Sequence, residues 1–344
     1  MSSVDLNRKE VNSMSDRYMA VDCGKSETKI AVRVNNTGEM QCDSFQTRVI
    51  ERFNGNSYDS VVDNSDGCFT VEYDGRQYAV GNNVQEKAGF TTTSNSKSDI
   101  IHKIATLTAI ATHVNNGDSV RVVIGCPIGL FKNKANRESY LNYILPKGRI
   151  DITVNGARKY FSISCSEVLP ESAGARYLFE EKFKDRSVGV IDIGGLNVNC
   201  CIWDNGKLIP DTCFTDKLGR NVLVEKIKAA IEAKEECEFA NYEVERFIAQ
   251  GYITNSDPVK EEESKGFIES FQKEHIEDIW STCKRKGWNM EHMNLFFMGG
   301  GASMLKNYIK EKNSRSAVPD DTGFINAKGF LIKLCQLYRL TVKK

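Results

Sequence analysis

Short apolar runs that end in glycine-containing turns recur along the chain and predict β-strands. The first run, residues 18–21, ends in the turn Asp22-Cys23-Gly24, and an alternating segment follows at 29–34. Two such runs around a glycine-bearing turn predict a β-hairpin. The hairpin places the Asp22 carboxylate at the point where the first strand ends.

The second half of the chain repeats this pattern. The apolar run 187–191 ends in the turn 192–195, and a return run follows at 198–203. Asp192 opens this turn as Asp22 opens the first, and the two aspartates stand 170 residues apart. The repeat predicts an internal duplication, with one copy in each half of the molecule.

Apolar residues at helical spacing predict helices between the strands. The clearest helix covers 99–114, with Asp99 as its N-cap and a buried stripe from Ile100 to Ile110. The charged stretch 257–263 is interpreted as a solvated connection. Further helices are predicted over 132–144, 173–183, 222–234, 242–251, 264–286, 303–312 and 327–339, strands over 68–73, 76–80, 120–125 and 295–298, and a hairpin over 150–165.

Composition fits a soluble protein with more than one core. A chain of 344 residues exceeds what a single core usually serves. Lys plus Arg equals Asp plus Glu at 46 each, so the basic excess of a nucleic-acid-coating protein is missing, and self-association is electrostatically unopposed. The sequence has no apolar run of about 18 residues and no apolar signal core in 1–16. We therefore expect a cytoplasmic protein with a disordered leader and no membrane partner.

Eleven cysteines raise the question of a metal site or disulfides. The sequence has no Cys-x-x-Cys pair, and the adjacent Cys200 and Cys201 would point to opposite faces of a strand. Structural zinc needs clustered ligands. We interpret the cysteines as reduced, buried thiols.

The two Asp-x-Gly turns have a chemistry of their own. Glycine lets backbone N–H groups approach an anion closely, and successive N–H groups form a concave site for phosphate oxygens. The aspartate repels phosphate but is suited to hold Mg²⁺ through water. Two such turns facing each other would clamp a polyphosphate, and a Gly triplet before a helix, 299–301, would suit a nucleoside or its α-phosphate.

Five segments, in this order along the chain, resemble the motifs of the actin, sugar kinase and heat-shock chaperone ATPases. Their span, from residue 18 to about 340, covers nearly the whole sequence. Pro170-Glu171 followed by Ser172-Ala173 is similar to the ParM type of this actin-like ATPase superfamily. The first phosphate motif is 21–26 with Lys29, the first connecting segment 169–173, the second phosphate motif 191–197, the adenosine motif 297–302 and the second connecting segment 325–330.

The resemblance implies ATP as cofactor, or GTP in its place, together with Mg²⁺. It implies that Asp22 and Asp192 position the metal through water, and that Glu171 orients the attacking water as a general base, so that Glu171 and Asp192 are the catalytic residues. Lys29 is either the phosphate-contacting lysine or an exposed strand lysine. The implied nucleotide-binding residues are Asp22, Cys23, Gly24, Lys25, Ser26, Lys29, Asp192, Gly194, Gly195, Leu196, Asn197, Gly299, Gly300 and Gly301.

The fold class expected from the duplication and the resemblance is α/β, an actin-like (ribonuclease H-like) two-lobed fold with duplicated sheet-and-helix cores around a nucleotide cleft. The expected domains are a leader over 1–16, a first lobe over 17–165 with a small β-rich insertion at 36–98, a second lobe over 166–325 with a helical insertion at 217–290, and a C-terminal helix over 326–344 that returns to the first lobe.

The resemblance implies an ATPase that polymerises into a filament and segregates plasmid DNA. Its partners would be further copies of itself and a DNA-bound adaptor protein, without direct contact to nucleic acid. A small-molecule kinase of the sugar or acetate type is the alternative, as is another bacterial actin that positions a cellular structure. A chaperone-type ATPase would need an appended peptide-binding domain, for which about 40 residues after the Gly triplet leave no room. Fold alone does not decide among these functions.

Overall fold

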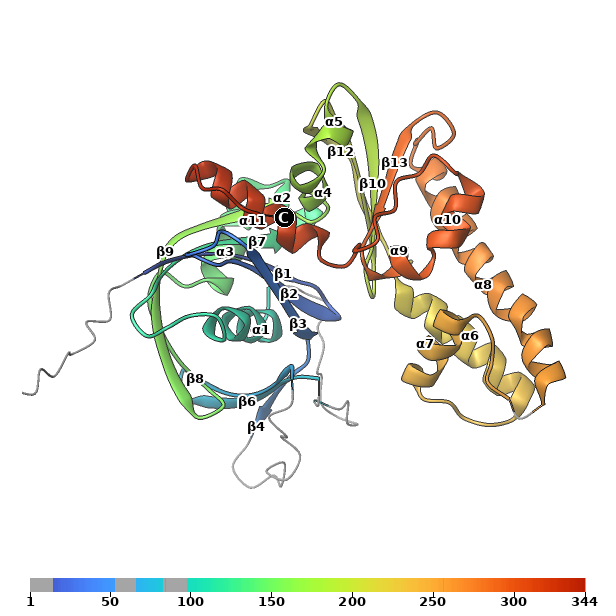
Figure 1. The fold of residues 1–344 in the computed structure, drawn as a ribbon, viewed down its shortest axis with the longest axis horizontal. Coiled ribbons are helices and arrows are strands. Elements are labelled where there is room, and N and C mark those ends of the chain that lie inside the picture. The colour runs from blue at the N-terminus through green and yellow to red at the C-terminus, as the bar shows by residue number, and fades with distance from the viewer. Residues whose placement is uncertain (1–14, 53–65, 83, 85–97, 256, 344) are drawn as a thin grey trace, which may run out of the picture.

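The computed structural model describes residues 15–52, 66–82, 84, 98–255 and 257–343, and these residues form two lobes joined at one side (Figure 1). Most of the predicted leader, residues 1–14, lies outside the described residues. No helix in the described part of the chain combines the length and the apolar character that a membrane crossing requires.

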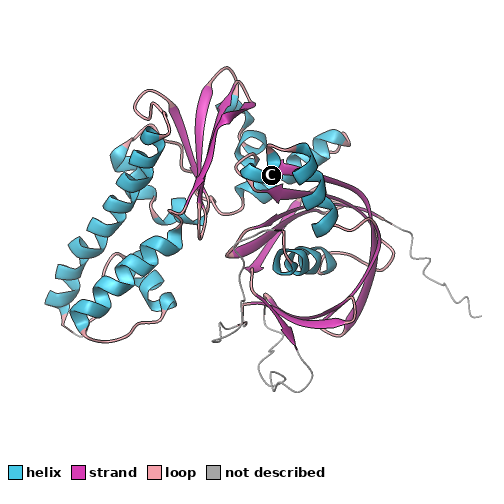
Figure 2. Cartoon of the chain, turned by 180° about the vertical axis from the view of Figure 1, so that it is seen from behind, coloured by secondary structure: helices cyan, strands magenta, loops and turns pink. Residues whose placement is uncertain are grey.

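The described part of the first lobe contains a nine-stranded sheet that curls around helix α1 (Ile100–Ala111), as Figure 2 shows from behind. The strand pairs β1–β7 and β7–β9 are parallel, and the other pairs are antiparallel. The order across the sheet is β3 (Met40–Gln46), β2 (Glu27–Arg33), β1 (Asp16–Cys23), β7 (Ser119–Cys126), β9 (Ala157–Pro170), β8 (Gly148–Val154), β5 (Cys68–Tyr73), β6 (Arg76–Gly81) and β4 (Val49–Arg52).

Helix α1 forms where its apolar spacing predicts a helix, and the Asp99 carboxylate caps it by accepting a hydrogen bond from His102 N at 3.1 Å. Ile104, Leu107 and Ile110 are fully buried between the helix and the sheet. Ile100 is the exception in the predicted stripe, with 40% of its surface exposed. Two further helices, α2 (Ile128–Phe131) and α3 (Lys134–Ile144), pack beside β7 and β9.

The second lobe is built on a four-stranded sheet in which β10 and β13 are parallel. One face of this sheet is covered by a helical layer, and the two share a core that includes Ile191, Leu223, Ile268 and Phe297. The sheet order is β12 (Lys207–Asp216), β11 (Val198–Asp204), β10 (Ser187–Ile193) and β13 (Asn294–Met298), and the helical layer consists of α6 (Arg220–Glu235), α7 (Asn241–Gln250), α8 (Pro258–Arg285), α9 (Gly300–Met304) and α10 (Lys306–Lys312).

A third core joins the two sheets. It contains Ala20 and Val123 from the first sheet, Val190 and Phe296 from the second, and the helices α4 (Gly174–Leu178), α5 (Glu180–Phe183) and α11 (Ile325–Leu337) between them. Helix α11 packs on β1 and β7 of the first lobe and crosses α4. The chain passes between the lobes at this crossing, once before α4 and once before α11.

The crossing of α4 and α11 brings two backbones into contact. A Cβ on Gly329 would stand 2.0 Å from the Gly174 carbonyl oxygen, and a Cβ on Gly174 would stand 2.4 Å from the Ile325 carbonyl oxygen. Glycine is therefore required on both helices for this approach.

Several predicted elements differ from the structure. The stretch 257–263 is not a connection: α8 begins at Pro258, with the Asp257 side chain accepting from Val259 N at 2.9 Å. Asp as N-cap and Pro in the first turn start a helix, so this interpretation was wrong. Leu337 is 52% exposed and lies off the buried face of α11. Helices predicted as single at 173–183 and 303–312 are each divided in two, and strands β3, β4 and β12 were not predicted.

The cysteines are mostly buried, as predicted: eight are buried, Cys42 is half-buried, and Cys165 and Cys237 are exposed. Cys200 and Cys201 do point to opposite faces of β11. Cys200 lies in the core under the helical layer, and Cys201 lies in the core that joins the lobes.

Candidate functional site

The two Asp-x-Gly turns have the same internal hydrogen bond. Gly24 N donates to Glu27 O at 2.9 Å in the first turn, and Gly194 N donates to Asn197 O at 2.9 Å in the second. These two N–H groups therefore close their own turns, and the N–H groups that face a phosphate must come from the residues that follow each glycine. The predicted duplication is confirmed at the level of individual hydrogen bonds.

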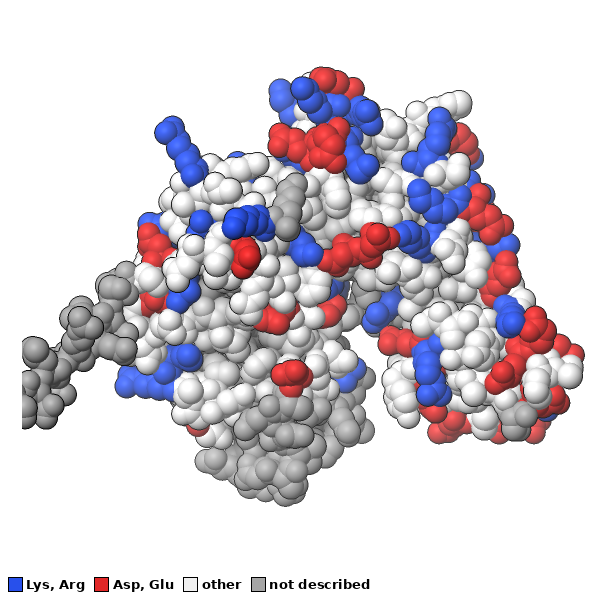
Figure 3. Space-filling view, viewed as in Figure 1, with Lys and Arg blue, Asp and Glu red and all other residues white. Residues whose placement is uncertain are grey.

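The tips of the two turns touch. A Cβ on Gly195 would stand 2.0 Å from Ser26 Oγ, so the second turn has space for Ser26 only because residue 195 is glycine. In the amide orientation that satisfies both of its ends, Asn197 accepts a hydrogen bond from Lys25 Nζ at 3.3 Å. The predicted phosphate residues of both lobes thus lie side by side. Figure 3 shows the molecule hollowed between the lobes.

Three carboxylates gather beneath these turns. The pKa of Asp192 is raised from its ordinary value of 3.8 to about 7, first by burial and then by the negative charges of Asp22 and Glu171, whereas Lys29 and a hydrogen bond from Asn326 act in the opposite direction. Asp22 also lies against β7, where a Cβ on Gly125 would stand 3.0 Å from Asp22 Oδ1. The sequence-predicted pair Asp22 and Asp192 is therefore brought together with Glu171.

Glu171 follows the end of β9, where its backbone N donates to Cys126 O at 2.9 Å. The side chain is buried, with 6% of the residue's surface exposed, and its Oε2 accepts from Asn199 Nδ2 at 2.8 Å. Asn199 in turn accepts from Thr215 Oγ1 at 2.8 Å. Glu171 was predicted as a site residue, but Asn199, which donates a hydrogen bond to its carboxylate, was not.

The Lys29 side chain is 13% exposed, so it is not an exposed strand lysine. Its Nζ lies 3.1 Å from Glu27 Oε2, and it is close enough to Asp192 to oppose the rise in the pKa of that carboxyl group. Lys29 and Asn199 occupy equivalent positions in the two hairpins. Lys29 pairs with Asp22 in the first hairpin as Asn199 pairs with Asp192 in the second.

Cys23 lies in the first turn, but its side chain points into the first lobe. It is buried, and its Sγ lies 3.3 Å from Thr28 Oγ1. Only the backbone of Cys23 is therefore available to a ligand in the cleft.

Two glycines of the triplet, Gly299 and Gly301, have no space for a side chain, whereas Gly300 faces open space. Gly299 has φ +87°, and a Cβ there would stand 2.5 Å from Asp192 Oδ1; a Cβ on Gly301 would stand 2.3 Å from Ile193 Cγ2. Gly300 has nothing within 4 Å of its Cβ position. Gly299 N donates to the carbonyl of Thr322, whose buried hydroxyl has no hydrogen-bond partner within the described residues. Open space and an unsatisfied hydroxyl next to the triplet suit a polar ligand.

The second turn is also fixed by the start of α6. Arg220 N donates to Gly194 O at 2.8 Å and Asn221 N donates to Gly195 O at 2.8 Å. A Cβ on Gly219 would stand 2.4 Å from Gly195 O, so this position also requires glycine. The first N–H groups of α6 therefore hold the turn, and the positive end of a 16-residue helix lies at the predicted phosphate site. The sequence signal for Gly219 was a glycine directly before a helix.

The donor set fits Mg²⁺. Three carboxylates with one nearby lysine leave buried negative charge, which a divalent cation would offset, and carboxylate oxygens are ligands that Mg²⁺ prefers. In the part of the chain that the structure describes, no three His, Cys, Asp or Glu side chains converge closely enough to bind a metal directly. Asp22 and Asp192 would therefore hold the ion largely through water.

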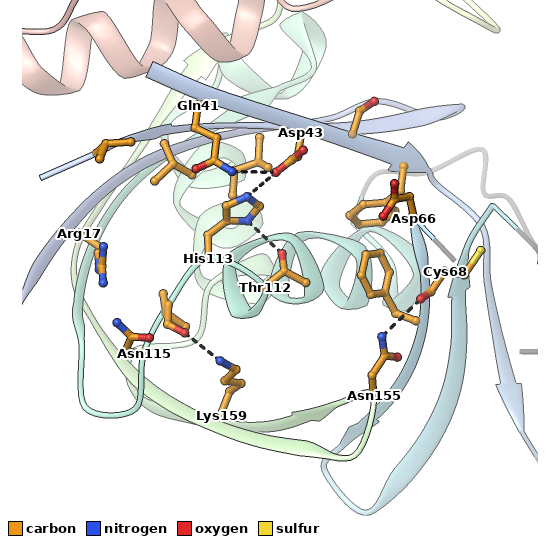
Figure 4. A pocket seen from close by; sticks show the side chains of 18 of the residues that line it. Arg17, Gln41, Asp43, Asp66, Cys68, Thr112, His113, Asn115, Asn155 and Lys159 are labelled. Atoms are coloured by element: carbon orange, nitrogen blue, oxygen red, sulfur yellow. Dashed lines mark hydrogen bonds and ion pairs between the residues drawn. The ribbon is translucent and has the colours of Figure 1, made fainter. Parts of the chain in front are cut away.

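A separate cavity of about 830 Å³ lies in the first lobe near the end of α1 (Figure 4). None of the predicted site residues lines it. Two of the side chains that line it have partners within the protein: His113 Nε2 lies 2.8 Å from Asp43 Oδ2, and Lys159 Nζ donates to the Val114 carbonyl at 3.1 Å. The candidate site therefore remains the junction of the two turns.

The chain is similar to known proteins in part of its sequence and in its fold. Residues 20–174 match the family model described as "Actin like proteins N terminal domain". The chain is similar to the Alp12 filament structure (23% identity, 94% of this chain and 100% of that chain, TM-score 0.69). It is similar to the actin-like protein Alp7A (16% identity, 94% of this chain and 97% of that chain, TM-score 0.75). It is also similar to a 15-stranded ParM filament from Clostridium botulinum (17% identity, 94% of this chain and 100% of that chain, TM-score 0.71). No curated protein sequence matches it.

The two lobes, the paired turns and the matched domain define an actin-like fold. The predicted two-lobed, actin-like α/β fold is confirmed. The solved structures that it resembles include ParM and Alp proteins, which confirms the resemblance to the ParM type.

Proposed function

We propose that this protein binds ATP with Mg²⁺ between its lobes, polymerises into filaments in the ATP-bound form, and hydrolyses ATP. The observation that carries the proposal is the contact between Ser26 and Gly195, which brings two phosphate-type turns together above Asp22, Glu171 and Asp192. Two turns from different lobes that share one ligand couple the ligand to the angle between the lobes.

The residues divide the work of hydrolysis. Backbone N–H groups of the two turns and Lys29 hold the phosphates, and Mg²⁺ neutralises charge on them when it is bound. Glu171, fixed by Asn199, orients the attacking water and accepts its proton. Gly300 and Thr322 form the side of the site that faces the nucleoside.

We extend the proposal to the cellular role. The similarity to a ParM filament supports a filament that segregates plasmid DNA through a DNA-bound adaptor protein, within the cytoplasm and without direct contact to nucleic acid. Loss of the gene would then raise the rate of plasmid loss without changing plasmid copy number. An unchanged rate of loss would favour another cargo.

Light scattering with simultaneous measurement of phosphate release tests the biochemical proposal. We expect scattering to rise on addition of ATP and Mg²⁺ alone, with phosphate release following polymerisation. Asp192→Asn should abolish both. If phosphate transfer instead requires an added sugar or carboxylic acid, and scattering stays flat, the protein is a small-molecule kinase of the same fold.

A further inference from the structure

We propose that Asn326 is a positioning residue that fixes the base Glu171 and the carboxylate of Asp192 relative to one another where the lobes join. This inference rests on the proposed nucleotide function and assigns a role to a residue outside the phosphate turns. It stands on a closed chain of contacts, made by side-chain hydrogen bonds, by the strand pairing of Asn199 with Asp192 and by the peptide bond between Glu171 and Ser172.

Asn326 lies in the first turn of α11 and is buried, with 4% of its surface exposed. Its Nδ2 donates to Asp192 Oδ2 at 3.1 Å. Its Oδ1 accepts from two backbone groups, Ser172 N at 3.1 Å and Gly174 N at 3.3 Å. One amide therefore binds the metal-site carboxylate with one end and the segment that follows Glu171 with the other.

Asn199 completes the chain of contacts from the opposite side. Its Nδ2 donates to Glu171 Oε2 at 2.8 Å, and its backbone is the register partner of Asp192 across β10 and β11. The contacts form a ring. It runs from Glu171 to Asn199 and on to Asp192, and then from Asp192 through Asn326 to Ser172, the residue next to Glu171. Each asparagine therefore restrains both acidic residues.

The ring lies where the two chain connections between the lobes cross, and this position suggests its role. Asn326 lies beside the contact between Gly174 and Gly329, where the two chain connections between the lobes cross. Groups near a pivot move little when the lobes rotate, whereas the turn tips at Ser26 and Gly195 move further. The ring can therefore keep base and carboxylate in register while the cleft opens and closes. Ser172, with φ +76°, is held in its left-handed conformation by the same amide.

Two substitutions separate the two ends of the Asn326 side chain. Asn326→Asp keeps an oxygen that accepts from Ser172 N and Gly174 N but replaces the donor to Asp192 with a repelling charge. Asn326→Ala removes both contacts. Ile325→Val, a neighbouring buried position on the same helix, is the matched control for lost packing.

For ATP hydrolysis we expect Asn326→Asp and Asn326→Ala to lower kcat by about 10- to 100-fold, the usual effect of removing an outer-shell partner. KM for ATP should change little, and Ile325→Val should behave as wild type. Asn199→Ala should lower kcat similarly, and the double variant Asn199→Ala with Asn326→Ala should lose little more than either single variant, because the ring acts as a unit. Wild-type kcat in Asn326→Ala, or fully multiplicative losses, would overturn the proposal.

Hydrogen exchange in the nucleotide-free protein gives a readout that does not depend on ATPase activity. The amides of Ser172 and Gly174 should lose protection in Asn326→Ala but keep it in Asn326→Asp and Ile325→Val. If the wild type hydrolyses no ATP, the proposed function fails, while exchange still decides whether Asn326 holds the Glu171 segment. Unchanged protection in Asn326→Ala would refute the positioning role.

Discussion

Ser26 in the first turn and Gly195 in the second lie in contact across the two lobes, so that a Cβ on Gly195 would stand 2.0 Å from Ser26 Oγ and 2.7 Å from Ser26 Cβ. The first turn belongs to the hairpin β1–β2 and the second to the hairpin β10–β11. Their contact defines how far the cleft can close, because each turn is fixed at its base by strand pairing. The size of the side chain at residue 195 therefore limits how far the cleft can close.

Gly195→Ala should hold the two turns apart. We expect weaker ATP binding and a raised KM, together with a loss of stability of about 1–3 kcal/mol, the usual cost of overpacking. Nucleotide titration and urea unfolding measure the two effects. Adding Ser26→Gly, which removes the clashing Cβ and Oγ, should restore part of both. If Gly195→Ala binds ATP as the wild type does, the turns do not meet in the working protein.

Glu171→Gln tests the proposed base with little change of shape. The glutamine oxygen can still accept from Asn199, but it cannot take a proton from water. We expect kcat to fall by about 100-fold or more, with ATP affinity preserved and filaments that persist longer after ATP is supplied. Turnover under single-cycle conditions measures the chemical step. A variant that hydrolyses saturating ATP normally but binds it poorly would show that Glu171 is a binding residue.

The contact between α4 and α11 predicts a large effect at a position far from any side-chain chemistry. A Cβ on Gly329 would stand 2.0 Å from the Gly174 carbonyl oxygen, and backbone cannot move aside as a flexible side chain can. We expect Gly329→Ala to cost about 3 kcal/mol or more, at the upper end for overpacking. Chemical unfolding measures it.

Gly266→Ala is the matched control for that experiment. Gly266 is exposed within α8, with nothing within 4 Å of its Cβ position. Alanine there should stabilise the protein by about 0.5–1 kcal/mol, because it lowers the entropy of the unfolded chain and has the higher helix propensity. Equal effects of the two substitutions would show that α4 and α11 do not touch.

Much of the site could be predicted from sequence because its parts are local. An apolar run ending in Asp-x-Gly specifies a strand, a turn and a carboxylate within a few residues, and its repetition at Asp192 indicated that the two belong together. Asn199 and Asn326 could not be predicted in this way. Their roles depend on contacts with Glu171 and Asp192 that exist only after two sheets and two connecting segments are assembled.

Strand β12 illustrates the same limit in the fold. Its sequence includes Pro210 and mixes polar and apolar residues, since it is an edge strand with most of its side chains exposed or half-buried. Edge strands lack the apolar run that reveals a central strand such as β10. The start of α8 differs from the prediction for another reason: the charges at 260–263 are typical of a solvated loop, whereas the N-cap Asp257 and the proline beside it start a helix.

The raised pKa of Asp192 predicts how stability depends on pH in the metal-free protein. Its carboxyl group has a pKa of about 7 when folded, against the ordinary value of 3.8. Between these values the folded state keeps a proton that the unfolded state has released, so the free energy of unfolding must fall as pH rises. The stabilising contribution is full below about pH 4 and lost above about pH 7.

Urea unfolding in the presence of a chelator, at pH values from about 4 to about 8, compares the wild type with Asp192→Asn on this point. The asparagine does not titrate, so the variant should lack this part of the pH dependence. Its free energy of unfolding should therefore increase relative to that of the wild type as pH rises. Mg²⁺ with ATP favours the ionised carboxylate, so adding both should reduce the wild type's loss of stability at high pH and release protons on binding near neutral pH. Parallel curves for the two proteins would mean that Asp192 is already ionised in the folded state. Burial and the charges of Asp22 and Glu171 would then not be enough to keep the proton on Asp192.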